Sequence, residues 1–214
     1  MASSSDGLTL DEAVAAARTG DVWIFRGRSV ADRAIQAATN SPVNHVGMAL
    51  VLEDLPPLMW HAELGRSLPD VWTGERHRGV QLHDLREAVL RWQTTYRQRA
   101  WVRQLLPEAG RAQEDGALRA VARLDGVSFP FTGRLAWRWL RGRDAHLSRR
   151  QDRAKGMRPE VAYCAEVVGA TFEEMGLLDG DVPTGWYDPG VFWSGDRLPL
   201  REGWTLGGEV PVRG

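Results

Sequence analysis

The sequence predicts an α+β domain in which strands pack against helices. Its 214 residues fit one domain, at about 100 to 200 residues per domain. Apolar residues make up 43% of the chain and charged residues 26%, as in ordinary globular proteins, which excludes a disordered or coiled-coil chain. Helix-like and strand-like segments follow one another without a regular βαβ alternation. We find no repeat or linker that would divide the chain.

The first half of the chain holds most of the predicted strands. Thr9 and Glu12 have capping-box spacing, and the alanine-rich run after them predicts a helix that ends near Gly20. Ser29 and Asp32 give the start signal of a second helix, over 29–38. Short apolar runs predict strands over 21–25, 45–52, 57–63, 79–82 and 99–105.

Two helices are predicted in the second half. One covers 113–124 and is followed by a turn over 126–131. The other begins at Cys164, because Val167, Val168 and Phe172 continue one apolar helical face from that residue. Gly176 closes this helix, and short strands and turns are expected beyond it.

Composition narrows the function classes. The formal net charge of −1 gives no bulk electrostatic reason for nucleic-acid binding, so we expect no nucleic-acid partner. We also expect no cofactor. A single cysteine excludes an internal disulfide. The first twenty residues do not read as an export signal, and no apolar run approaches the about 18 to 20 residues that span a bilayer. We therefore expect a cytoplasmic protein.

One segment departs from this charge balance. Residues 134–158 hold eight arginines and Lys155 against two aspartates, and Trp137 and Trp139 interleave with the arginines. Such a segment can bind an anionic ligand or a membrane surface. It can equally be a solvated rim whose tryptophans cover the core. The sequence leaves both interpretations open.

The residues with the clearest chemistry are Cys164, His45 and His61. Unpaired amides and the helix dipole at a helix start stabilise a thiolate and lower its pKa below the free value of about 8.5. A nucleophilic cysteine also needs a base and a group that orients the base. His45 and His61 lie in successive predicted strands, which can bring both imidazoles to one end of a sheet. Glu63 would share a strand face with His61.

Other interpretations stay open for the same residues. A lone cysteine on an apolar helix face is often only a packing residue. Cys164, His45 and His61 can also supply three zinc ligands, although the sequence lacks the close-spaced ligand pair typical of such sites. His77, His83 and His146 stand in polar or arginine-rich surroundings and are expected at the surface.

Four stretches of the sequence resemble the permuted papain-like cysteine amidases. They are, in order, GDVWIFR at 20–26, ATNSPVNHVGM at 38–48, WHA at 60–62 and YCAEVV at 163–168. That family comprises the YiiX-like, circularly permuted relatives of the NlpC cell-wall peptidases, and lecithin:retinol acyltransferase belongs to the same broader group. The resemblance implies a single permuted papain-like domain over 1–214. An antiparallel sheet or partial barrel would pack against helices, with the cysteine at a helix N-terminus.

The resemblance also implies an activity. Cys164 is the nucleophile, His45 the base and His61 the third member of a Cys-His-His triad that works through an acyl-enzyme. The expected substrates are amides, peptides or acylated small molecules, and the expected reaction is hydrolysis or acyl transfer. The sequence departs from the family pattern at His61, where YiiX-like members often have glutamate, and at Ala165, where serine is more common. A catalytically inactive binding module for an anionic partner is the alternative.

Overall fold

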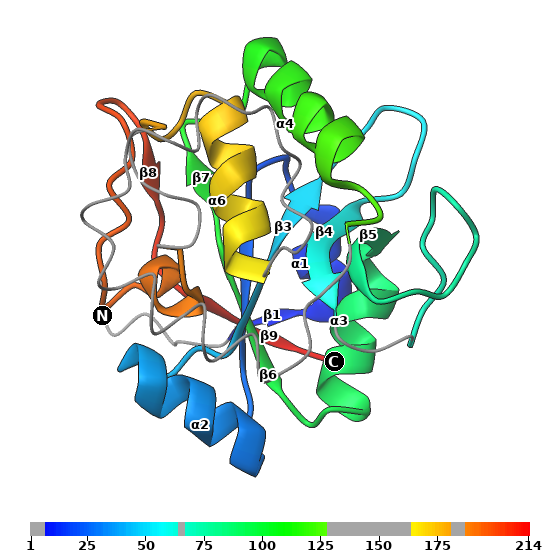
Figure 1. Ribbon diagram of the computed structural model, residues 1–214, viewed down its shortest axis with the longest axis vertical. Helices are drawn as coiled ribbons and strands as arrows, with labels where there is room; N and C mark the ends of the chain where they lie inside the picture. Colours follow the sequence, from blue (N-terminus) through cyan, green and yellow to red (C-terminus); the bar gives the residue numbers. More distant parts are fainter. Residues whose placement is uncertain (1–6, 64–66, 128–163, 181–186) are drawn as a thin grey trace.

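A central seven-stranded sheet organises the chain, whose computed structural model describes residues 7–63, 67–127, 164–180 and 187–214 (Figure 1). The strand order is β1-β9-β6-β2-β3-β4-β5, and every neighbouring pair is antiparallel except β1 with β9. The strands are β1 (Leu8–Thr9), β2 (Val22–Arg26), β3 (His45–Leu50), β4 (Leu58–Glu63), β5 (Gly79–Asp84), β6 (Arg99–Arg103) and β9 (Val210–Arg213). A second sheet pairs β7 (Leu105–Leu106) with β8 (Thr205–Leu206).

Helices cover both faces of the large sheet. They are α1 (Leu10–Ala15), α2 (Val30–Thr39), α3 (Leu85–Thr94), α4 (Arg111–Leu124) and α6 (Cys164–Glu174), with a short 3-10 helix η2 (Pro189–Phe192). In Figure 1, α4 and α6 lie in front of the sheet, and α1 and α3 lie behind it. We call these two sides the α6 face and the α3 face. The mixed helix-and-sheet class predicted from the sequence is confirmed.

The hydrophobic core has two parts, one on each face. Along β2, Val22 and Ile24 pack in the cluster on the α6 face, whereas Trp23 and Phe25 pack in the cluster on the α3 face. Alternate residues of a strand point to opposite faces, so a strand buried on both sides is apolar throughout. This explains why the first four residues of β2, Val22 to Phe25, form a continuous apolar run.

The predicted elements are largely found, with small shifts at their ends. The capping boxes Thr9 with Glu12 and Ser29 with Asp32 are both present. The first helix ends at Ala15, before Gly20, because the chain must turn there into β2 and Gly20 takes a φ of 92°. The sequence analysis did not predict α3 or β1, and it expected short strands without bounds in the region that holds β8 and β9.

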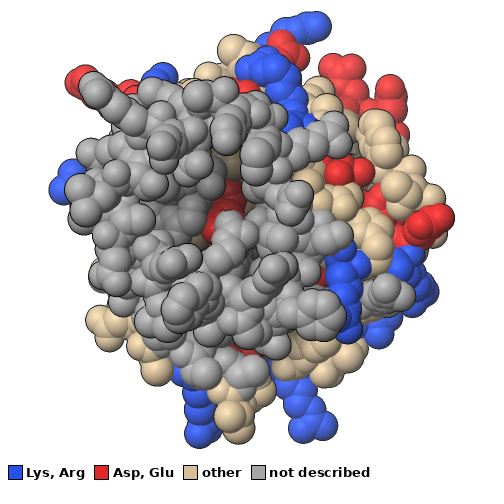
Figure 2. Space-filling view, viewed as in Figure 1, with Lys and Arg blue, Asp and Glu red and all other residues tan. Residues whose placement is uncertain are grey.

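The structure does not test the prediction of an anionic ligand or membrane surface at the arginine-rich segment. The arginine-rich segment 134–158 lies outside the described residues, so an anionic ligand there stays a prediction. On the described part of the face in Figure 2, acidic and basic side chains both occur. None of the helices in the described ranges is long and apolar enough to cross a membrane.

Candidate functional site

Three buried histidines form a hydrogen-bonded chain across adjacent strands. His45 Nε2 lies 3.0 Å from His61 Nδ1, and His61 Nε2 lies 3.0 Å from His83 Nδ1. The residues come from β3, β4 and β5, which are neighbours in the sheet. The predicted meeting of His45 and His61 at one sheet is therefore confirmed, and His83 extends the chain.

Strand alternation and one glycine make this contact possible. His45 shares the α3 face of β3 with Gly47, since the residue between them, Val46, belongs to the α6-face cluster. A Cβ on Gly47 would lie 2.4 Å from Met59 Sδ and 3.3 Å from the Cβ of His61. The missing side chain thus leaves the space in which β4 brings His61 close to His45.

Helix α3 covers the histidines from outside the sheet. The ring of Trp92 stacks on His45 with centroids 3.9 Å apart and planes 12° from parallel. Phe25, opposite His45 on β2, approaches the same imidazole to 5.6 Å between centroids. Aromatic rings on two sides fix the plane of the His45 ring.

A buried carboxylate lies next to His83, at the end of the row of three hydrogen-bonded histidines. Glu63, the last residue of β4, has Oε2 3.8 Å from His83 Nδ1. Its Oε1 accepts hydrogen bonds from Tyr96 Oη at 2.7 Å and from Ser67 Oγ at 2.9 Å. Glu63 and His61 share the α3 face, as their spacing predicted.

Burial keeps all three imidazoles neutral. Loss of water lowers the pKa of His61 to about 3 and that of His83 to about 3. Burial, and then the neighbouring His61, lowers the pKa of His45 well below its ordinary value. Each neutral ring has one N–H donor and one acceptor nitrogen, so the chain can transmit a defined tautomer.

Cys164 is the first residue of α6 and is buried on the α6 face. Burial raises the pKa of its thiol to about 11, although hydrogen bonds from the backbone amides of Val46 and Ala165 act in the opposite direction. The helix-start argument predicted a lowered pKa. That prediction is wrong for this structure, because the loss of hydration outweighs the helix amides.

The thiol of Cys164 and the imidazole of His45 lie near the same end of β3 but on opposite faces of the sheet. The β3–β4 pairing runs from Met48 to Leu50 on β3, so the Val46 amide lies beyond that ladder and is within reach of the thiol. His45, the residue before it, points to the α3 face. Among the described hydrogen bonds none joins the sulfur to either His45 or His61.

The remaining histidine predictions have mixed outcomes. His83 was expected at the surface but is only 1% exposed, because β5 continues to Asp84 and carries it to the buried α3 face. The alternation from Gln81 to His83 was the available signal, and the predicted strand over 79–82 ended two residues before β5 does. His77 is partly exposed, as expected. His146 lies outside the described residues.

The possible metal ligands also differ from those weighed on the sequence. Cys164, His45 and His61 do not form a ligand group in the described part of the chain. The group found there comprises His61, Glu63 and His83, whose ligand atoms all lie within 4.8 Å of one another.

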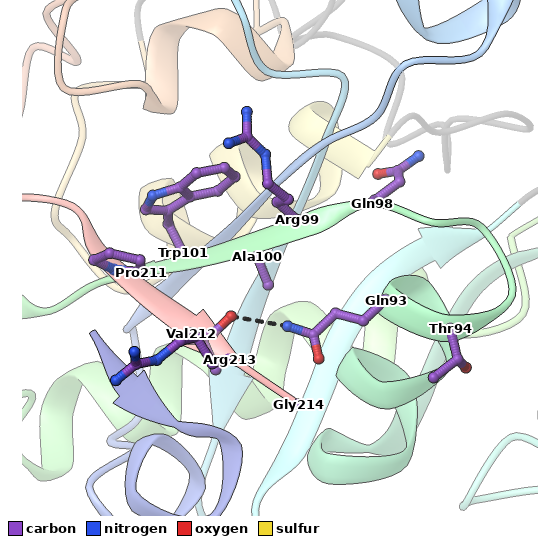
Figure 3. Close-up of a pocket in the computed structure, with 10 residues that line it drawn as sticks. All are labelled: Gln93, Thr94, Gln98, Arg99, Ala100, Trp101, Pro211, Val212, Arg213 and Gly214. Carbon is purple, nitrogen blue, oxygen red and sulfur yellow. Dashed lines mark hydrogen bonds between the residues drawn. The ribbon is translucent and has the colours of Figure 1, made fainter. Parts of the chain in front are cut away.

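A groove of about 600 Å³ lies elsewhere, between strands β6 and β9 and the end of α3 (Figure 3). Its lining includes Arg99, Trp101 and Arg213, and Gln93 donates to the Val212 carbonyl across it at 2.9 Å. Neither Cys164 nor any residue of the histidine chain lines this groove. We therefore do not assign it to the candidate site.

Comparison with known proteins adds little at the sequence level. No protein-family model matches the chain, and no curated protein is significantly similar to it. Among solved structures, the chain is similar to a crystal structure described as metalloprotein yiiX from Escherichia coli O157:H7, DUF1105. The TM-score is 0.49 at 19% sequence identity, and the match covers 74% of this chain and 66% of that chain, slightly less than two thirds of its length.

Proposed function

We propose that the chain is a cysteine-dependent hydrolase or acyltransferase in which Cys164 is the nucleophile. One observation carries the proposal. The thiol at the start of α6 accepts a hydrogen bond from the Val46 amide, and the residue next to Val46 is His45, which is itself hydrogen-bonded to a second imidazole. In this proposal Cys164 is the nucleophile, His45 the base and His61 the group that orients the base, with the thiol on the α6 face and the imidazoles on the α3 face near the end of β3.

The hydrogen bond to His61 decides which nitrogen of His45 acts. Because Nε2 of His45 is engaged by His61 Nδ1, Nδ1 of His45 is the nitrogen that takes the thiol proton. This requires the Nε2–H tautomer of His45, which donates to His61. His61 then donates from its Nε2 to His83.

The proposed reaction begins from a neutral pair. The raised thiol pKa and the lowered imidazole pKa leave no thiolate–imidazolium pair in the free protein. Proton transfer to His45 therefore accompanies attack of the sulfur on the substrate carbonyl. Catalytic hydrogen bonds that are long in a free enzyme often tighten only when substrate binds. In this proposal, the His45 ring and the Cys164 thiol come together around the end of β3 when substrate binds.

The later steps follow the usual balance of an acyl-enzyme. As the carbon–sulfur bond forms, the carbonyl electrons move to oxygen, where amides at the start of α6 can donate hydrogen bonds. Collapse breaks the bond to the leaving amine or alcohol, which receives the proton from His45. Water or an acceptor amine then attacks the thioester and regenerates the thiol. The substrate class is an amide, peptide or acylated small molecule.

The proposal is tested by hydrolysis of p-nitrophenyl acetate by the full chain and four variants. Cys164→Ala removes the nucleophile and His45→Ala the base, so each should lower turnover at least ~10³-fold, and the two losses should not add. His61→Ala leaves both in place and should cost about 10- to 10³-fold. His61→Glu should recover part of that loss.

The control is His77→Ala, which removes a partly exposed imidazole that is not one of the three hydrogen-bonded histidines. This variant should leave turnover unchanged. Circular dichroism checks that each variant folds. Wild-type turnover in His45→Ala would remove the triad. Wild-type turnover in His61→Ala would move the orienting role to another group, with Glu63 the next candidate.

A further inference from the structure

We infer that His61, Glu63 and His83 form a binding site for a divalent transition-metal ion, with zinc as the first candidate. The site is distinct from Cys164, because its residues lie on the α3 face and the thiol lies on the α6 face. It uses His83, which no step of the proposed reaction touches directly.

The ligand atoms are already close to the spacing that zinc requires. Zinc–nitrogen bonds of about 2.0 to 2.1 Å in a tetrahedron put neighbouring ligand atoms about 3.4 Å apart. His61 Nε2 and His83 Nδ1 are 3.0 Å apart, and His83 Nδ1 is 3.8 Å from Glu63 Oε2. Small side-chain rotations are enough to place all three around one ion.

The chemistry of the donors also suits a metal. Imidazole ligates in its neutral form, and His61 and His83 are both buried, at 0% and 1% exposed. Two imidazoles with one carboxylate are a ligand set of catalytic zinc sites. Glu63 is 2% exposed, and a cation would compensate its buried charge more completely than the neutral partners around it.

One buried acceptor next to these residues is unpaired. The amide oxygen of Gln81 is buried and has no hydrogen-bond partner. Gln81 faces His61 directly across the β4–β5 pair, so its oxygen is available as a fourth ligand. A buried polar atom without a partner costs free energy, and an ion would remove that cost for the Gln81 oxygen.

Outer contacts hold these ligands in position. Tyr96 Oη and Ser67 Oγ donate to Glu63 Oε1 at 2.7 and 2.9 Å, and Ser67 Oγ also lies 3.2 Å from Oε2, an oxygen with a further lone pair for the ion. His45 Nε2 stands 3.0 Å from His61 Nδ1, where it accepts the proton that a metal on Nε2 would fix on Nδ1. Such partners of ligating residues set the tautomer and orientation of a metal site.

This last contact links the metal to the proposed function, on which the following consequence rests. Base catalysis needs His45 to donate from Nε2 to His61. With a metal on His61 Nε2, the donor is His61 Nδ1–H, and His45 must then keep its proton on Nδ1, the nitrogen that should take the thiol proton. Zinc is therefore expected to inhibit the acyl transfer.

The test measures metal binding by the chelator-treated full chain. Zinc, titrated against a chromophoric chelator, should bind at one ion per chain, and cobalt(II) should give the visible absorption of a site with fewer than six ligands. Glu63→Gln and His83→Gln should each weaken binding at least ~10- to 100-fold, the loss expected of even an outer partner. His77→Gln is the matched control and should bind as wild type does.

Several results would overturn the site. The proposal fails if the full chain binds neither ion, or if folded Glu63→Gln and His83→Gln bind with unchanged affinity. It also fails if Cys164→Ser loses binding, because the thiolate would then be a ligand. Tyr96→Phe, which keeps all three ligands, should weaken binding by a smaller factor and guards against a folding defect.

The link to catalysis is read separately. Zinc should inhibit ester hydrolysis with the midpoint found for binding, and His83→Gln should relieve the inhibition. Binding of one zinc ion per chain without inhibition would show that the metal does not affect catalysis, and the proposed metal site itself would stand. Binding by a chain that forms no acyl-enzyme would refute the proposed function instead.

Discussion

Cys164 and His45 are both held in their neutral forms by burial, which is the main constraint on any chemistry between them. The thiol pKa is raised to about 11 and the pKa of His45 is lowered, so proton transfer from sulfur to nitrogen is uphill in the free protein. The amides of Val46 and Ala165 are the groups that can stabilise the developing thiolate. Under the proposed function, the pair is therefore expected to react only when substrate is bound.

The pH dependence of alkylation tests this picture at the residue scale. The rate of Cys164 modification by iodoacetamide should rise with pH through values above the about 8.5 of a free cysteine, because the thiolate is the nucleophile and burial raises the thiol pKa. Glutathione under the same conditions provides the reference profile, and Cys164→Ser shows the background. An inflection below that of glutathione would mean that the helix amides dominate over burial.

Three neighbouring strands and one helix build the candidate site. β3, β4 and β5 each place one histidine on the α3 face, and α3 closes over them with Trp92 stacked on His45. The strands supply the spacing and the helix excludes water. The lowered pKa values of the imidazoles follow from this covering rather than from any one residue.

Acid sensitivity of folding is the prediction at the element scale. Histidine in an unfolded chain titrates near about 6.5. Burial lowers the pKa of His61 and that of His83 to about 3 in the folded protein, so below about pH 6.5 the unfolded chain binds protons that the folded chain does not. The free energy of unfolding should therefore fall as the pH is lowered from 7 toward 4, by up to about 1.4 kcal/mol per pH unit for each such histidine.

Urea unfolding at several pH values measures this slope. The slope reports how many more protons the unfolded chain binds than the folded chain. His83→Gln should reduce this number by about one, and His77→Gln should leave it unchanged. Asp21, whose pKa burial raises to about 6, acts with the opposite sign between its ordinary value and 6, but it is common to all variants and cancels in the comparison. Identical slopes in His83→Gln and wild type would contradict the account of a buried neutral imidazole.

At the scale of the whole molecule, the sequence predicted the parts with strong local signals. Apolar runs marked β3 and β4, and the helical spacing after Cys164 marked α6. Helix α3 was missed although Asp84 caps it and Leu85, Ala88 and Val89 form its buried stripe. Without α3, neither the covering of His45 nor the burial of His83 could be foreseen.

The relation between thiol and imidazoles depends on long-range packing. The family resemblance implies that His45 and Cys164 act together, but α6 packs on one face of β3 while the His45 side chain points to the other. The burial that reverses the expected shift of the thiol pKa has the same origin. Local pattern sets the faces of a strand, and tertiary packing decides which helix covers each face.

Capture of the acyl-enzyme tests the central claim most directly. The full chain is mixed with p-nitrophenyl acetate, quenched in acid within the first turnover and analysed by intact mass and peptide mapping. The account predicts one acetyl group per chain, located on Cys164, formed more slowly in His45→Ala and absent in Cys164→Ala. An unmodified Cys164 during turnover, or an acetyl group that persists at the same rate in Cys164→Ala, would contradict it.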